Sequence, residues 1–339
     1  MTTMRTLAIL GASLMTLAAA APPAARAESQ EIRLAKQFSM GYLELNVLEH
    51  QKLIEAHAKA LGLGEIKCVW STFNGPDAMN TALVAGDIDV VAGGVPGLVT
   101  LWAKTRGTAQ EVRGVAALSS QPFLLNTRNP AIKSVVDFTE ASRIALPAVK
   151  VSVQAVTLEM AAAQAFGKAN YAKLDPLTVS LSPPDATVGL ISGGGAFDSV
   201  FSVPPFQNQQ LAAPGIHTVL NSFDVLGGSH SFTVAWTSRK FHDQNPKLYR
   251  ALLDALSEAA GIVNADKRAA AALWIEDSHS KMALDFATEV VSAPQVRWTL
   301  VPEHTMKFAD FMYEVGTIKT KPESWKDLFF PEIDSLPGS

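Results

Sequence analysis

Short apolar runs alternate with longer segments of helical periodicity through most of the chain. The apolar runs predict strands at residues 32–35, 66–70, 88–91, 112–118, 143–146 and 178–181. Helical periodicity predicts helices at residues 43–50, 78–84, 152–166, 246–260, 266–275 and 298–316. Strands that alternate with helices are typical of parallel sheets covered by helices, so the expected fold class is α/β.

One pattern occurs twice along the chain. Pro-Asp-Ala at 76–78 recurs at 184–186, and Val-Pro at 95–96 recurs at 203–204 with the same separation. A helical stretch, a glycine stop and a strand-like run lie between the two motifs in each copy. Unrelated αβ units could share this order, because glycine and proline punctuation is common. The agreement in order and spacing favours two similar halves with a cleft between them.

The amino terminus has the layout of a cleavable secretory signal at residues 1–27. Arg5 precedes an apolar run at 7–21, and Ala-Arg-Ala at 25–27 provides the small residues that a signal peptidase accepts. A membrane anchor is the alternative, but crossing a bilayer takes about 20 apolar residues. We therefore expect cleavage after Ala27, a periplasmic location and no direct insertion into the membrane.

Charge limits the partners that this protein can have, and cysteine content limits the ways in which its fold can be stabilised. The chain has 28 basic and 32 acidic residues and a formal charge of -4, so nucleic acid is not an expected partner. Its single cysteine, Cys68, excludes an internal disulfide, and the fold must be stabilised by a hydrophobic core.

The sequence lacks the usual signs of catalysis. Its seven histidines form no close pair with metal-ligand spacing, and no Gly-x-Ser-x-Gly motif occurs. The glycine-rich stretch at 192–196 follows a helix and precedes a strand, which indicates a helix stop and not a phosphate-binding loop. We therefore predict no metal, no cofactor and no enzymatic activity.

Several short segments lie at characteristic places along the chain. They are Gln-Phe-Ser-Met-Gly-Tyr-Leu at 37–43, Phe-Asn-Gly-Pro-Asp-Ala-Met at 73–79, Ala-Gly-Asp-Ile-Asp at 85–89, Gly-Gly-Val-Pro at 93–96, and Phe241 with Pro-Lys-Leu-Tyr at 246–249. In their order and spacing, these segments resemble the nitrate, sulfonate and taurine group of ABC-importer binding proteins, which also includes binders of thiamine-precursor pyrimidines.

The resemblance implies a type II periplasmic-binding fold, with two lobes of parallel or mixed sheets flanked by helices and a ligand cleft between them. Residues 28–119 and 226–339 would form the first lobe, and residues 120–225 the second. Gly227 and Gly228 could absorb a hinge rotation as the lobes close on a solute. The implied partners are a small-molecule ligand and the membrane subunits of an ABC permease, and the protein is expected to be a monomer.

In open α/β sheets, ligands bind beyond the carboxyl ends of the strands, near helix N-termini. The residues expected to touch the ligand are Phe38, Met40, Gly41, Tyr42, Asn74, Gly75, Gly94, Val95, Lys150, Ser152, Val153, Gln154, Pro204, Phe206 and His230. Helix N-termini suit an anionic group, so a sulfonate- or carboxylate-like solute is the leading expectation. Because these loops lack an arginine, a neutral or aromatic ligand is the alternative.

Several of these side chains have a purely structural alternative. Lys150 could be a solvated surface lysine, Ser152 a helix cap and His230 a buried structural histidine. The aromatic side chains, Trp236 among them, could belong to the core. At the level of function, a ligand-sensing subunit for a membrane receptor and an enzyme of the pyrimidine-synthesis type are the alternatives to the importer component.

Overall fold

The structure, a computed structural model, describes residues 27–339. The signal peptide predicted at residues 1–27 therefore lies outside the described residues, except for Ala27. Within the described range, no helix is both long enough and apolar enough to span a bilayer.

The first sheet has the strand order β11-β4-β10-β3-β1-β2. Its strands are β1 (Glu31–Gln37), β2 (Lys67–Phe73), β3 (Val90–Gly94), β4 (Val112–Ser120), β10 (Ser231–Ser238) and β11 (Arg297–Trp298). Strand β1 pairs in parallel with β2 and β3, whereas β10 lies antiparallel between β3 and β4. The sheet therefore presents the carboxyl ends of β1, β2 and β3 at one edge.

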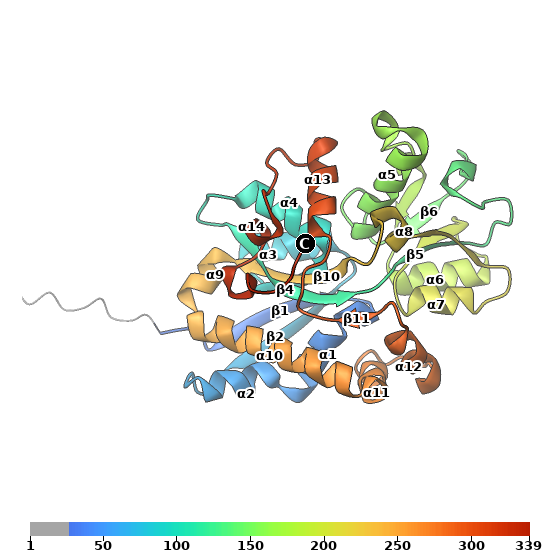
Figure 1. The fold of residues 1–339 in the computed structure, drawn as a ribbon. Coiled ribbons are helices and arrows are strands. Elements are labelled where there is room, and N and C mark those ends of the chain that lie inside the picture. Colours follow the sequence, from blue (N-terminus) through green and yellow to red (C-terminus); the bar gives the residue numbers. More distant parts are fainter. Residues whose placement is uncertain (1–26) are drawn as a thin grey trace, which may run out of the picture.

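The second sheet has the order β7-β6-β8-β5-β9. Its strands are β5 (Leu124–Thr127), β6 (Ile144–Leu146), β7 (Thr178–Ser180), β8 (Ser199–Phe201) and β9 (His217–Asn221). Strand β6 is parallel to β7 and β8, and β5 lies antiparallel between β8 and β9. Both sheets thus contain three parallel strands followed by an inserted antiparallel strand, and the expected α/β fold with two lobes is confirmed (Figure 1).

The repeated sequence pattern occupies equivalent places in the two sheets. Helices α3 (Pro76–Ala85) and α6 (Pro183–Ser192) contain the two Pro-Asp-Ala motifs. The strands that follow them, β3 and β8, each lie between the central parallel strand and the inserted antiparallel strand. Common architecture of the two halves is therefore the correct interpretation of the repeat.

Helices cover both faces of the first sheet. The others in this lobe are α1 (Leu43–Gln51), α2 (Leu53–Ala60), α4 (Val95–Thr105), α9 (Arg239–Gln244), α10 (Pro246–Ala265), α11 (Lys267–Asp277), α12 (Leu284–Ser292), α13 (Thr305–Glu314) and α14 (Trp325–Leu328). Figure 1 shows α1, α2, α10 and α11 on one side of this sheet and α3, α4, α13 and α14 on the other. The second sheet has helices α5 (Val153–Phe166), α6, α7 (Phe206–Leu211) and α8 (Ser222–Leu226).

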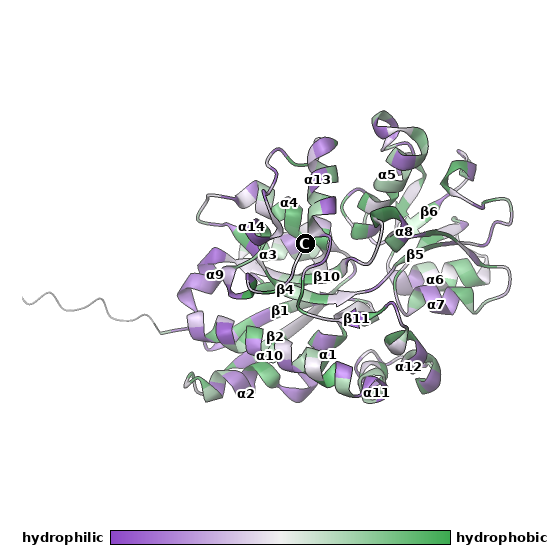
Figure 2. Ribbon diagram, in the orientation of Figure 1, coloured by the Kyte–Doolittle hydropathy of each residue, from purple (hydrophilic) through white to green (hydrophobic). Residues whose placement is uncertain are grey.

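Helix α10 shows how the sequence pattern produces this packing. Leu248, Leu252, Leu256 and Val263 recur at intervals of about one or two turns and are fully buried. They face α1 and α2, whereas the outward turns of α10 are hydrophilic (Figure 2). The helix therefore follows from an apolar stripe packed against its neighbours.

The prediction of a helix at residues 298–316 was wrong in its first third. Trp298 lies in β11 and pairs with Ser119, and helix α13 begins only at Thr305. Pro302 lies between them and cannot continue a helical hydrogen-bond ladder.

Strands β5, β9, β10 and β11 were not among the predicted strands. The residues of β10 are almost all buried, so they lack the alternation of polar and apolar positions that marks a half-exposed strand.

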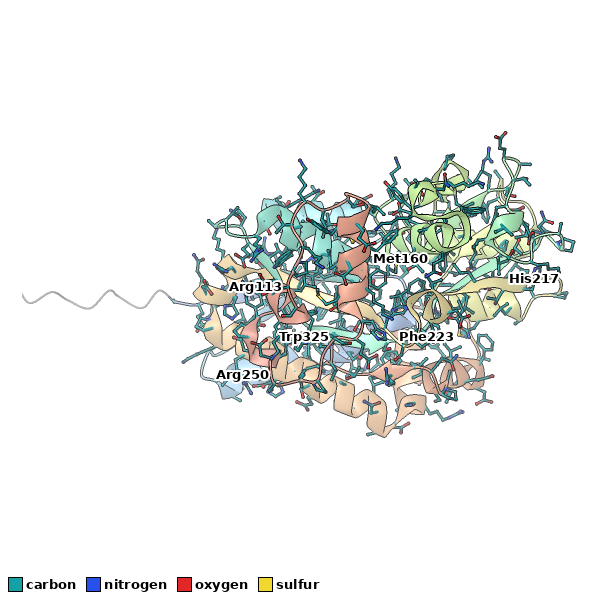
Figure 3. The ribbon with its side chains drawn as sticks, turned by 45° about the horizontal axis from the view of Figure 1, so that its top comes forward. Arg113, Met160, His217, Phe223, Arg250 and Trp325 are labelled. Carbon is teal, nitrogen blue, oxygen red and sulfur yellow. The ribbon has the colours of Figure 1, made fainter. Side chains whose placement is uncertain are left out.

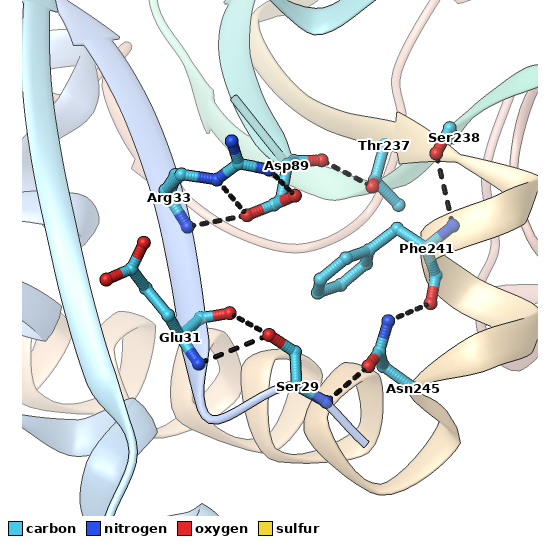
Figure 4. Close-up of polar contacts among 8 residues, drawn as sticks. All are labelled: Ser29, Glu31, Arg33, Asp89, Thr237, Ser238, Phe241 and Asn245. Carbon is cyan, nitrogen blue, oxygen red and sulfur yellow. Dashed lines mark hydrogen bonds and ion pairs between the residues drawn. The ribbon is translucent and has the colours of Figure 1, made fainter. Parts of the chain in front are cut away.

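Polar contacts connect strands of the first sheet at the end opposite the carboxyl ends of β1, β2 and β3 (Figure 4). The Arg33 guanidinium on β1 forms a bidentate pair with Asp89, at 2.6 and 2.9 Å. The Asp89 carbonyl accepts a hydrogen bond from the Thr237 hydroxyl on β10, at 2.6 Å. These contacts hold β1 and β10 in register with the residue that precedes β3. The strands are therefore fixed relative to one another, and so are the loops at their other ends.

Candidate functional site

The carboxyl ends of β1 and β3 and the loops after β6 and β8 meet in a cleft between the lobes. The chain crosses from one lobe to the other at residues 121–123 and returns at residues 227–230, between the ends of β4 and β5 and between α8 and β10. Helices α3, α4 and α5 begin at this cleft, because each is the first helix after the carboxyl end of a parallel strand. The cleft is thus the place where a solute would meet both lobes.

The lobes touch each other at the loop after β1. The Ser39 hydroxyl donates to the Pro204 carbonyl at 2.8 Å and accepts from the Gly41 amide at 2.9 Å. The Met40 amide donates to the same Pro204 carbonyl at 3.0 Å. These bonds join a loop of the first lobe to a loop of the second, so the structure represents a closed arrangement.

Two glycines permit this close approach. A Cβ added at Gly94 would lie 2.5 Å from the Cβ of Val153, and one added at Gly75 would lie 3.1 Å from the Pro147 carbonyl oxygen. Real Cβ atoms do not approach other carbon atoms to 2.5 Å, so a side chain at Gly94 would force the lobes apart. Gly94 therefore belongs to the closing surface of the cleft.

An inner cavity of about 30 Å³ remains inside the closed cleft. Its lining residues are Gln37, Phe38, Ser39, Tyr42, Asn74, Pro76, Gly94, Gly97, Pro147, Val151, Ser152, Val153, Gln154, Pro183, Val203 and Phe232. None of these side chains, all within residues 27–339, is charged. Recognition in this cavity therefore depends on neutral hydrogen-bonding groups and backbone amides.

Two polar side chains of the inner cavity are deeply buried and have no hydrogen-bond partner among the described residues. Gln154 is 3% exposed and Tyr42 is 4% exposed. Burial also raises the pKa of the Tyr42 hydroxyl, so that hydroxyl stays protonated and can donate. Because both side chains line the cavity, a bound solute or water can supply the missing hydrogen-bond partners.

The helices that start at the cleft add backbone donors. Helices α3 and α4 begin after Gly75 and Gly94, which offer no side chain to cap the free N–H groups of the first turns. Pro76 and Pro96 each remove one N–H from these turns, and Asp77 adds a negative charge to the first turn of α3. Helix α5 is capped instead by Ser152, whose hydroxyl accepts from the Ala155 amide at 3.2 Å. Uncapped N–H groups and the helix dipole favour an anionic or hydrogen-bond-accepting group.

An outer cavity of about 420 Å³ adjoins the inner one and shares Gln37, Phe38 and Ser39 with it. Its lining residues are Lys36, Gln37, Phe38, Ser39, Asn46, Thr72, Pro184, Phe206, Trp274, Asp277, Ser278, His279 and Ser280. The Lys36 ammonium lies 2.5 Å from a Glu49 carboxylate oxygen and 3.0 Å from Asp277. This cation is therefore already paired within the protein.

The structure brings about half of the predicted ligand residues to these two cavities. The residues that line the inner cavity are Phe38, Tyr42, Asn74, Gly94, Ser152, Val153 and Gln154. Phe206 lines the outer cavity. Met40, Gly41, Gly75 and Pro204 lie in the loops where the lobes touch, and Val95 is buried in the first turn of α4.

Lys150 and His230 line neither cavity. Lys150 is exposed. Burial raises the pKa of Glu159 to about 8 and also raises the pKa of Asp175, and the positive charge of Lys150 opposes both shifts. His230 is fully buried at the return crossing. Its Nδ1 is 3.0 Å from the Ser231 carbonyl and its Nε2 is 2.9 Å from the Ser222 hydroxyl. The structure thus favours the structural interpretation of both side chains.

Other lining residues were not predicted. Gln37 is the last residue of β1, and Phe232 lies on β10, a strand that the sequence did not reveal. Trp274 and Asp277 come from α11, more than 230 residues away from Lys36 and Gln37 in the sequence. Only the end of β1 carried a local signal, because a polar residue directly after a buried strand marks the ligand-binding edge of a parallel sheet.

The described residues contain no group of three or more side chains that could hold a metal ion.

A second inter-lobe contact lies beside the crossings, where Met160 of α5 and Phe311 of α13 line a common cavity. Figure 3 labels Met160 there, and Phe223 close to the return crossing. The cleft is therefore bordered by the crossings and by helix α13.

Solved structures share this fold. The alkanesulfonate-binding protein SsuA from Xanthomonas axonopodis pv. citri, bound to MOPS, is 18% identical with a TM-score of 0.68, and the match covers 86% of this chain and 95% of that one. SsuA from Escherichia coli, a periplasmic aliphatic sulphonate binding protein, is 18% identical with a TM-score of 0.65 and coverages of 89% and 92%. The periplasmic nitrate-binding protein NrtA from Synechocystis PCC 6803 is 15% identical with a TM-score of 0.66 and coverages of 91% and 86%.

These structures confirm the type II periplasmic-binding fold and the resemblance drawn from the sequence. A search among curated proteins found no match. The sequence model of the NMT1-like family matches residues 26–276, which is well over half of the 339 residues. The chain therefore belongs to the NMT1-like family.

Proposed function

We propose that this protein is the periplasmic solute-binding component of an ABC importer. It captures a small solute by closure of the lobes and delivers it to the membrane subunits of the permease, without catalysing a reaction. The lobes comprise residues 28–119 with 226–339 and residues 120–225, and the protein acts as a monomer after removal of residues 1–27. Family membership and the two-lobe fold support this role.

The observation that carries the proposal is the pair of unpartnered buried groups, Gln154 and Tyr42, in a cavity between two closed lobes. Both groups face a space in which three helices begin. Because the side chains that line this cavity carry no charge, the backbone amides of α3 and α4 are its source of positive potential. This arrangement favours a solute with one compact anionic group, such as a carboxylate or a sulfonate.

The test is a thermal-shift screen of residues 28–339 with acetate, methanesulfonate, nitrate, benzoate, benzenesulfonate and uncharged pyrimidines. A solute at about one hundred times its Kd stabilises the folded state by about 2.7 kcal/mol, which we expect to raise the Tm by several degrees. An anion should give this shift, and its uncharged analogues should not. Turnover of the stabilising compound, or no shift with any compound of the screen, would contradict the proposal.

Gln154→Leu tests the site itself. We expect the Kd for the stabilising solute to rise at least tenfold, about 1.4 kcal/mol, because the solute loses a buried hydrogen-bond partner. The free protein should keep its stability, because Gln154 has no partner among the described residues to lose. Gln110→Leu, at an exposed position outside the cleft, is the matched control and should leave the Kd unchanged.

A further inference from the structure

The closed cleft contains a small inner cavity and a much larger outer cavity, whose surface is mostly apolar. The inner cavity has a volume of about 30 Å³. The outer cavity, at about 420 Å³, falls in the range typical of small-molecule sites. A solute held by closed lobes can therefore place only a compact group in the inner cavity, and its body must lie in the outer one.

Aromatic side chains surround the outer cavity. Phe38 is 39% exposed, and it is the one phenylalanine of residues 27–339 among the exposed large hydrophobic side chains. Phe206 on α7 comes from the opposite lobe, and Trp274 comes from α11. Aromatic faces in a cavity between lobes favour a flat apolar body that contacts both sides at once.

Charge in the outer cavity disfavours a second anionic group. The two carboxylates of Glu49 and Asp277 share the single ammonium of Lys36, so the cluster carries an excess negative charge. The Asn46 amide donates a further hydrogen bond to Asp277 and holds this carboxylate in place. An additional anion on the body of the solute would meet this negative charge in a partly buried setting, where repulsion is weakly screened.

We propose that the solute of this cleft is a cyclic organic monoanion. Its one acidic group lies in the inner cavity, against Gln154, Tyr42 and the N–H groups that remain free in the first turns of α3 and α4. Its uncharged ring lies between Phe38 and Phe206. This inference rests on the solute-binding function proposed above and adds the shape and charge of the ligand. It excludes both small inorganic anions and dianions as preferred solutes.

The test is isothermal titration of residues 28–339 with acetate, benzoate and terephthalate, which differ in a ring and then in a second carboxylate. We expect benzoate to bind at least tenfold more tightly than acetate, because its ring enters the aromatic cavity. Terephthalate should bind at least tenfold more weakly than benzoate. Equal affinity for acetate and benzoate would contradict the prediction that the solute has a ring. Equal affinity for benzoate and terephthalate would contradict the prediction that it carries a single charge.

Substitutions at Phe206 locate the ring. In Phe206→Ala we expect the affinity for benzoate to fall at least tenfold while that for acetate stays unchanged. Phe206→Leu, which keeps more apolar volume, gives a smaller loss and guards against misfolding of the alanine variant. Phe166→Ala, at a half-buried position at the end of α5 that lines neither cleft cavity, is the control. Loss of acetate and benzoate binding in equal proportion in the Phe206 variants would overturn the placement of the ring.

Failure of this inference is distinguishable from failure of the proposed function. If the thermal-shift screen finds an anion such as nitrate and all three titration probes fail, solute capture stands and the cyclic monoanion is overturned. If neither experiment finds a bound anion, both proposals fail together.

Discussion

At the scale of single residues, His230 joins the two crossings between the lobes. A carbonyl can only accept, so Nδ1 donates to Ser231, and Nε2 accepts from the Ser222 hydroxyl when the ring is neutral. The Ser222 hydroxyl oxygen accepts in turn from the Phe123 amide at 3.1 Å. Phe123, Phe223 and Phe308 surround the ring with edge contacts. A proton on Nε2 would make this nitrogen a donor, and the Ser222 hydroxyl hydrogen would then lose its acceptor.

Burial, helped by the charges of His304 and Lys307, lowers the pKa of His230 from 6.5 to about 4. Between these two pH values the unfolded chain binds more protons than the folded one, so stability is lost as the pH falls from 6.5 to 4. The loss from this one group is on the order of 3 kcal/mol. We expect His230→Asn to lack this part of the pH dependence when urea unfolding is measured from pH 7 to pH 4. Identical slopes for the two proteins would refute this role of His230.

At the scale of elements, the start of the described chain caps helix α10. The Glu28 carboxylate accepts from the Lys247 amide at 3.2 Å and from the Leu248 amide at 2.9 Å. Asn245, at the N-cap position, does not cap these amides, and its side chain instead accepts from the Ser29 amide at 2.8 Å. The cap of a long core helix is therefore supplied by residues more than 200 positions away.

Removal of this cap should destabilise the protein. We expect Glu28→Ala to lower the free energy of unfolding by about 0.5–2 kcal/mol, since the first amides of α10 lose both a partner and a favourable negative charge. Glu28→Gln keeps the acceptor and should lose less. Glu65→Ala, at an exposed glutamate with no side-chain hydrogen bond among the described contacts, serves as the control in the same urea titrations. A Glu28→Ala variant as stable as the control would rule out the capping role.

The elements also show which parts of the fold the sequence could predict. Helix α5 was predicted with its cap, because a serine before an apolar helical stretch is a local signal. Strand β10 was missed because it is buried on both faces, and Phe232 of the cleft was missed with it. The contact between Lys36 and Asp277 spans 241 positions and leaves no local pattern. Sequence reasoning therefore found the loops of the site and not the residues that the tertiary fold brings to them.

At the scale of the whole molecule, closure depends on the surfaces that meet when the lobes come together. The bonds from Ser39 and Met40 to the Pro204 carbonyl join the two lobes, and Gly94 approaches Val153 across the cleft. A solute that contacts both lobes binds the closed form more tightly and shifts the population toward it. Any change that disfavours closure should therefore weaken binding.

Gly94→Ala provides that change. The added Cβ would lie 2.5 Å from Val153 across the cleft, and Gly94 has an ordinary extended backbone that alanine adopts without strain. Opening the lobes relieves the clash at less cost than deforming either one, so we expect a larger radius of gyration in small-angle scattering and at least a tenfold rise in Kd. Gly261→Ala, where a Cβ meets open space, should change neither. If the Gly94→Ala variant has the radius of gyration and the Kd of the unmodified chain, closure of the lobes does not require this contact. The lobes must then be arranged around a solute in a different way from the one described above.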